Sequence, residues 1–74
     1  MEELLALLRG INDTVDYENA QGLVTNKIID SIDISAIISE IEETFDIEIT
    51  MEYMENKNFD TVEAMWAMIQ ELAE

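Results

Sequence analysis

The chain has 74 residues, and its eighteen acidic and three basic side chains give it a formal net charge of −15 at pH 7. This charge excludes nucleic acid as a direct partner and makes a basic protein the natural complement. The lack of cysteine and histidine excludes disulfides, thiolate chemistry and the commonest general base and metal ligand. The length predicts a single domain, residues 1–74, whose core is too thin to enclose a catalytic pocket.

Two features of the sequence bear on location. No stretch is apolar over the ~18 residues that a membrane span requires. The chain starts Met1-Glu2-Glu3, with two acidic residues where a signal peptide has basic ones. We therefore expect a soluble cytoplasmic protein that does not insert into a membrane. Hydrophobic residues make up 49% of the chain, which argues against a disordered protein in spite of the charge.

The first predicted element is a helix over residues 2–12, followed by a long loop. Gly10 is expected to fray or end this helix. Residues 13–30 include Asn, Asp, Thr, Gln and Gly without a sustained period, so we interpret them as an ordered loop; a loop this long in a small domain is often functional. The apolar residues that share a helix face are Leu4, Leu8 and Ile11, with Leu5 and Leu7 beside them, and those expected to pin the loop to the core are Leu23, Val24, Ile28 and Ile29.

The second predicted element is a helix over residues 31–44. Its isoleucines are β-branched and favour strands, but they recur at helical spacing, and the spacing decides. Residues 45–49 alternate like a strand. No other segment offers a partner strand, and a lone strand leaves its backbone groups unpaired, so we interpret these residues as an extended loop with Ile47 and Ile49 in the core. The apolar positions of the helix are Ile34, Ile37, Ile38, Ile41 and Phe45.

The last predicted elements are a short helical turn and a third main helix. The turn covers residues 51–55 with Thr50 as its cap, and residues 56–58 are expected to break it. The third main helix is expected to begin at Asp60, which with Glu63 fits a capping-box pattern. Its apolar residues, interpreted as core rather than as a ligand surface, are Val62, Met65, Trp66, Met68, Ile69 and Leu72. The sequence therefore predicts an all-α fold, a small bundle of three main helices plus one short helix, with a long loop between helices 1 and 2.

The segment Asp30-Ser31-Ile32-Asp33 lies where the long loop ends and the isoleucine-rich helix begins. Serine and aspartate are favoured there because their side-chain oxygens accept hydrogen bonds from free backbone N–H groups at a helix N-terminus. Either Ser31 or Asp30 is therefore expected to cap the helix, and capping alone would explain the pair.

Three segments together resemble the acyl carrier protein family, over nearly the full length of the chain. Asp30-Ser31-Ile32-Asp33 resembles the family's Asp-Ser-Leu-Asp motif, with isoleucine in place of leucine. Residues 40–49 (EIEETFDIEI) resemble the acidic run that closes the family's second helix, and residues 59–62 (FDTV) resemble the start of its last helix. The chain departs from the family at residues 26–29 (NKII), where carriers usually have a glycine shortly before the serine. The resemblance implies an acyl-carrier-like bundle.

The resemblance implies that a phosphopantetheinyl transferase attaches a 4′-phosphopantetheine arm from coenzyme A to Ser31. The arm carries acyl or aminoacyl groups as thioesters between enzymes. Its phosphodiester would lie at a helix N-terminus, where the dipole and free N–H groups favour an anion. Asp30 is implied to position a divalent metal during this modification, and no resident metal is expected. Ser31 has no histidine to activate it, so we expect a non-catalytic carrier rather than an enzyme.

The second predicted helix also carries the expected partner surface. By resemblance, this helix binds basic patches on the transferase, on acyl or aminoacyl synthetases or ligases, and on acyltransferases. Ile32 would add a small apolar contact beside Ser31, and the chain is expected to act as a monomer. A solvated helix face explains any single glutamate equally well. The acids expected to project toward partners are Asp33, Glu40, Glu42 and Glu43.

Two questions stay open at the level of sequence. The cargo is either an acyl chain of fatty-acid or secondary-metabolite synthesis, or the D-alanine of teichoic acid modification, whose carriers also start their last helix with an aromatic residue followed by Asp-Thr, as residues 59–61 do. The function is either that of a carrier or that of a non-catalytic acidic helical module that binds a basic protein, with Ser31 only a cap. A calcium-binding EF-hand loop is disfavoured, because Ile32 stands at a ligand position after Asp30 and no glycine follows at the sixth.

Overall fold

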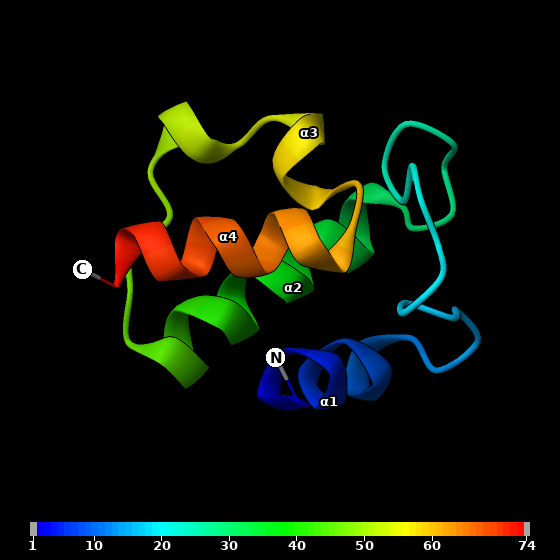
Figure 1. Cartoon of the computed structure of the whole chain (residues 1–74), viewed down its shortest axis with the longest axis horizontal. Coiled ribbons are helices and arrows are strands. Elements are labelled where there is room, and N and C mark those ends of the chain that lie inside the picture. The colour runs from blue at the N-terminus through cyan, green and yellow to red at the C-terminus, as the bar shows by residue number, and fades with distance from the viewer. Residues whose placement is uncertain (1, 74) are drawn as a thin grey trace.

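The structure describes residues 2–73, and all the secondary structure in this part of the chain is helical (Figure 1). This confirms the predicted all-α class. In this computed structural model the long helices are α1 (Glu2–Ile11), α2 (Ser31–Phe45) and α4 (Val62–Leu72). Between α2 and α4 lie a 3₁₀ helix, η1 (Met51–Tyr53), and a short helix, α3 (Asn56–Phe59). α1 packs against α2 and α4, α3 packs against α4, and the long loop after α1 covers one end of the bundle. None of these helices is long and apolar enough to cross a membrane.

Both ends of α2 are set by local hydrogen bonds. The backbone of Asp30 is extended, and its Oδ1 accepts a hydrogen bond from the Asp33 backbone N–H at 2.8 Å. Asp30, and not Ser31, is therefore the cap. α2 ends at Asp46, whose N–H donates to the carbonyl oxygen of Glu42; its left-handed backbone (φ 54°) then turns the chain so that the Ile47 N–H also reaches that oxygen.

The predicted start of the last helix is wrong by one residue. Thr61, not Asp60, caps α4, because the Thr61 Oγ1 accepts a hydrogen bond from the Ala64 N–H at 3.0 Å. The Asp60 carboxylate instead accepts hydrogen bonds from Val24 and Thr25 in the loop before α2. Asp60 is thus a contact between distant segments rather than a local cap.

The short helical region also differs from its prediction. η1 ends at Tyr53, and its expected cap Thr50 makes no capping hydrogen bond; the Thr50 hydroxyl donates to Glu52 at 3.3 Å. Residues 56–58 do not break the helical region but form most of α3, because Phe59 at the end of α3 is buried and anchors this turn to the core. The region therefore holds two short helical elements where one was predicted.

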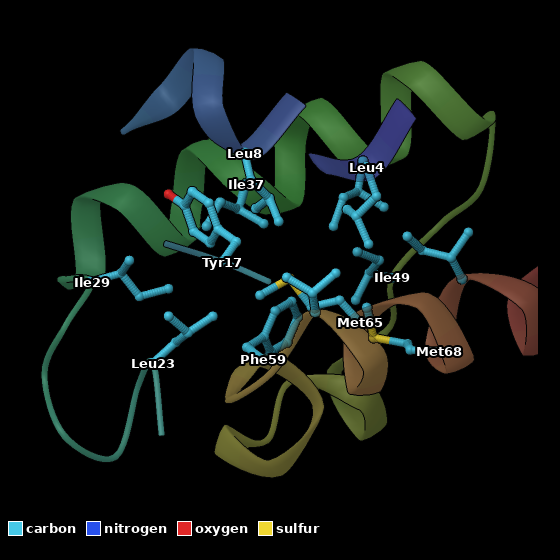
Figure 2. Packing of buried hydrophobic residues seen from close by; sticks show 13 residues of the cluster. Leu4, Leu8, Tyr17, Leu23, Ile29, Ile37, Ile49, Phe59, Met65 and Met68 are labelled. Atoms are coloured by element: carbon cyan, nitrogen blue, oxygen red, sulfur yellow. The ribbon is translucent and has the colours of Figure 1, made fainter. Parts of the chain in front are cut away.

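Thirteen buried hydrophobic residues form the core (Figure 2). From α2 come Ile37 and Ile41, both 0% exposed, so the predicted apolar stripe is confirmed, with Ile34 half-buried at its start. No charged or polar side chain is buried among residues 2–73, so apolar packing holds this core together. Its members are Leu4, Leu8, Tyr17, Leu23, Ile29, Ile37, Ile41, Ile49, Phe59, Val62, Met65, Met68 and Ile69.

The assignment of α4's methionines to the core is confirmed. Met65 and Met68 are buried and belong to the cluster. Trp66 is half-buried and meets Phe45 of α2 edge to face, with ring centroids 5.9 Å apart and planes at 70°. These contacts hold α4 against α2.

The long loop contributes core residues of its own. Leu23 and Ile29 are buried as predicted, and Val24 is half-buried. The prediction that Ile28 packs in the core is wrong. Ile28 is 41% exposed, because its neighbour Ile29 takes the inward position. Tyr17 is buried at 1% exposure although no periodic pattern points to it. The loop is thus a packed part of the domain.

Residues 47–49 lie outside the helices, with Ile49 buried and Ile47 half-buried as predicted. The predicted start of this segment is wrong, because Phe45 is the last residue of α2 and Asp46 is its left-handed cap. The Ile49 backbone N–H donates to Glu42 Oε2 at 2.9 Å, and the Ile47 N–H donates to the Glu42 carbonyl oxygen at 3.2 Å. Glu42 therefore supplies the acceptors that a partner strand would otherwise provide.

We expect Glu42→Ala to lower the free energy of unfolding by about 1 kcal/mol, because the Ile49 N–H loses a charged acceptor. Glu43→Ala is the matched control, because Glu43 is the next residue on α2 and is exposed; it should change the free energy by less than about 0.5 kcal/mol. Urea unfolding of both variants measures the difference. Equal effects would contradict the role assigned to Glu42.

Candidate functional site

Ser31 is the first residue of α2 and is exposed, as are Asp30 before it and Ile32 after it. The capping bond uses Oδ1 of Asp30, so helix capping does not require the Ser31 hydroxyl. Ile32 is 77% exposed, the second most exposed of the large hydrophobic residues that stand in solvent. An exposed hydroxyl and an exposed apolar side chain thus stand together at the head of a fifteen-residue helix.

Asp33 holds the first turn of α2 against the end of α1. Its Oδ2 accepts a hydrogen bond from Asn12 Nδ2 at 3.4 Å, and the Asn12 carbonyl oxygen accepts one from the Tyr17 hydroxyl at 2.9 Å. Burial raises the pKa of Tyr17, and the negative charges of Asp33 and Asp13 raise it further, so the phenol stays protonated as a donor. This network fixes the base of the loop beside Ser31.

The acids expected on the outer side of α2 fall into two pairs. Glu40 and Glu43 are exposed. Asp33 and Glu42 are half-buried, and each accepts a hydrogen bond from another segment of the chain, Asp33 from Asn12 and Glu42 from Ile49. The structure therefore presents Glu40 and Glu43 fully to a partner, while Asp33 and Glu42 also have structural contacts.

Two residues of the loop before Ser31 have left-handed backbones. Gly22 has φ 66°, and a Cβ atom there would lie 2.3 Å from Nδ2 of Asn26. Lys27 has φ 58° and therefore holds, without glycine, a backbone conformation that usually selects glycine.

Asp60, which the sequence predicts as the cap of the last helix, instead contacts the loop before Ser31. It accepts four hydrogen bonds from the loop: its carbonyl oxygen from the Leu23 N–H (2.9 Å), Oδ1 from the N–H groups of Val24 (3.0 Å) and Thr25 (2.9 Å), and Oδ2 from the Thr25 hydroxyl (2.7 Å). The hydrogen bonds from Thr25, backbone first, and from Val24 lower the pKa of Asp60 against a smaller opposing effect of desolvation. No local pattern identifies these bonds, because 35 or more positions separate the partners.

Few ion pairs form among the charged side chains of residues 2–73. Exposed ion pairs join Arg9 to Glu18 at 3.1 Å and Lys57 to Glu55 at 3.2 Å. Within residues 2–73 no three carboxylates come together in a group that would hold a metal ion.

Comparison of the chain with models of known protein families found no match. Comparisons with curated proteins and with solved structures found none either. What is inferred about function therefore depends on the Asp30-Ser31-Ile32-Asp33 motif and on the geometry around Ser31.

Proposed function

We propose that this chain is a non-catalytic carrier that bears 4′-phosphopantetheine on Ser31 and moves thioester-bound acyl or aminoacyl groups between enzymes. One observation supports the proposal most: Ser31 is exposed at the start of α2, and Asp30 performs the capping that would otherwise explain a serine there. The motif's resemblance to that of acyl carrier proteins indicates what would be attached to Ser31.

The start of α2 suits a phosphodiester. The first N–H groups of an α-helix lack intrahelical acceptors. The Asp33 N–H is taken by Asp30, while those of Ser31 and Ile32 have no acceptor within the helix. These groups and the dipole of a fifteen-residue helix favour an anion attached to Ser31.

The modification forms a bond between the Ser31 oxygen and the β-phosphorus of coenzyme A. The phosphoanhydride bond breaks, 3′,5′-ADP leaves, and the serine proton passes to a base on the transferase, because this chain has no histidine. Asp30 would help to position the transferase's divalent metal. Once bound, the arm supplies the thiol that this cysteine-free chain lacks.

The outer face of α2 is the proposed docking surface for the transferase, for loading synthetases or ligases, and for acyltransferases. Ile32 provides an apolar contact, and Glu40 and Glu43 provide exposed negative charge for basic patches. Asp33 and Glu42 add to the same negative potential while they hold their neighbouring segments. The proposed cargo is an acyl or a D-alanyl group. The same arm would carry either of them as a thioester.

A second candidate is an unmodified acidic module that binds a basic protein through Glu40, Glu43 and their neighbours. The net charge of −15 favours it as much as it favours a carrier. The two functions differ at Ser31, because a carrier is modified there and the acidic module is not.

The deciding experiment is incubation with coenzyme A, Mg²⁺ and a broad-specificity phosphopantetheinyl transferase, followed by intact mass spectrometry. We expect the wild-type chain to gain the mass of one phosphopantetheine. Circular dichroism before the reaction establishes that the chain is folded. A folded chain that gains nothing from several transferases would contradict the carrier function and favour the acidic module.

A further inference from the structure

The loop that leads into Ser31 is held at its middle by one residue of another element. Asp60, at the junction of α3 and α4, accepts the backbone N–H groups of Leu23, Val24 and Thr25 as well as the Thr25 hydroxyl. Three of these bonds end on the carboxylate. Hydrogen bonds to an ionised acceptor are stronger than those between neutral groups, so these bonds stabilise the contact between the middle of the loop and the rest of the domain.

Hydrogen bonds within the loop continue from this contact toward Ser31. The Ile29 N–H donates to the Leu23 carbonyl oxygen at 3.0 Å, and the Lys27 N–H donates to the Val24 carbonyl oxygen at 3.1 Å. Residues 23–29 therefore form a turn that the hydrogen bond between Ile29 and Leu23 closes. Asp60 binds the first residues of this turn. Ile29 is buried two residues before Ser31, so a displacement of the turn would reach the serine through only Ile29 and Asp30.

We propose that Asp60 is a positioning residue that controls how Ser31 is presented to the modifying enzyme, an inference that rests on the proposed function of Ser31. The carboxylate keeps residues 23–29 closed, and the closed turn fixes the backbone that enters α2. Without it, the turn opens part of the time and only a fraction of the molecules offers Ser31 in the competent position. An enzyme that binds only that fraction shows a weaker apparent affinity, while the reaction of the bound carrier is unchanged.

The test compares Asp60→Ala and Asp60→Asn with Glu63→Ala as the matched control. Glu63 is an exposed acid in the first turn of α4, three residues after Asp60, so its loss changes the charge without touching residues 23–25. Hydrogen exchange at the amides of Val24 and Thr25 reports on the contact itself. The kcat and the KM for the carrier, measured with the transferase, report on the presentation of Ser31.

In Asp60→Ala we expect amide protection at Val24 and Thr25 to fall by about tenfold or more. We also expect KM for the carrier to rise several-fold with kcat unchanged. Asp60→Asn keeps a neutral acceptor and should give intermediate values, whereas Glu63→Ala should match the wild type. If Asp60→Ala fails to fold, Thr25→Val replaces it, because that variant removes only the hydroxyl that donates to Oδ2.

A pH titration adds a second report on the contact between Asp60 and the turn, beside the hydrogen exchange at Val24 and Thr25. The pKa of Asp60 is lowered from its ordinary value of 3.8, so the closed turn binds the carboxylate form; its contribution is complete above that ordinary value and is lost as the pH falls through the lowered pKa. The amide resonance of Thr25 should therefore titrate below pH 3.8 in the wild type and not in Asp60→Asn.

Unchanged protection at Val24 and Thr25 in Asp60→Ala would overturn the inference, as would lost protection with an unchanged KM. Either result leaves the modification of wild-type Ser31 intact, so the proposed function would survive. A folded wild-type chain that accepts no phosphopantetheine overturns the proposed function and this inference together. The two failures are therefore distinguishable.

Discussion

Ser31→Ala is expected to abolish the addition of phosphopantetheine completely, because it removes the oxygen that forms the bond to phosphorus. The matched controls are Ser35→Ala and Ser39→Ala, one and two turns further along α2, since both of these serines are also exposed. Each control should gain one phosphopantetheine like the wild type. Intact mass spectrometry after incubation with coenzyme A and transferase measures all four proteins. Modification of Ser31→Ala, or loss of modification in a control, would contradict the assignment of the site.

The same variant separates attachment from helix capping. Because the Asp30 side chain, not that of Ser31, bonds to the Asp33 N–H, Ser31→Ala should change the free energy of unfolding by less than about 0.5 kcal/mol. Asp30→Ala removes the cap and should cost about 1 kcal/mol. A larger loss of stability in Ser31→Ala than in Asp30→Ala would mean that Ser31 is a structural cap after all.

Ile37→Asp is expected to unfold the domain. Ile37 lies at the centre of α2 with no exposed surface, among apolar residues only (Figure 2). A carboxylate there would be buried without a partner, and in addition the contacts of a large side chain would be lost. Together these effects cost several kcal/mol, and small domains are stable by only about 5–15 kcal/mol. We therefore expect no cooperative thermal transition by circular dichroism at neutral pH.

Two variants control for the chemistry and for the position of this substitution. Ile32→Asp places the same charge on the same helix at a side chain that is 77% exposed, and it should melt like the wild type. Ile37→Val shortens the buried side chain without adding charge, and it should cost about 0.5–1.5 kcal/mol. A native-like melt of Ile37→Asp would mean that α2 turns a different face to α1 and α4.

The start and the buried face of α2 were predictable because they depend on residues close together in the chain. Isoleucines at helical spacing define its buried face, and Asp30 caps it through the N–H of a residue only three positions away. The position of Ser31 at the head of this helix follows from the same local interactions. That residues 47–49 form an extended loop and not a strand was also predictable, because no other segment could pair with them.

Asp60 shows where prediction from the sequence failed. Asp60 and Thr61 are both suitable helix caps, and nothing nearby in the sequence distinguishes them. The N–H groups of Val24 and Thr25, which lie far away in the chain, take the Asp60 carboxylate and leave Thr61 to cap α4. The choice between two equivalent local caps was therefore made by a distant contact.

Local patterns were enough to predict the all-α class, the buried face of α2 and the place of Ser31 at its start, because helical spacing and caps act over three or four residues. Two features could be seen only in the folded chain: that Tyr17 enters the core while Ile28 does not, and that Asp60 holds the loop before Ser31. These features depend on segments that meet only after the chain has folded. The long loop has no period of its own, so its conformation is set by the helices against which it packs.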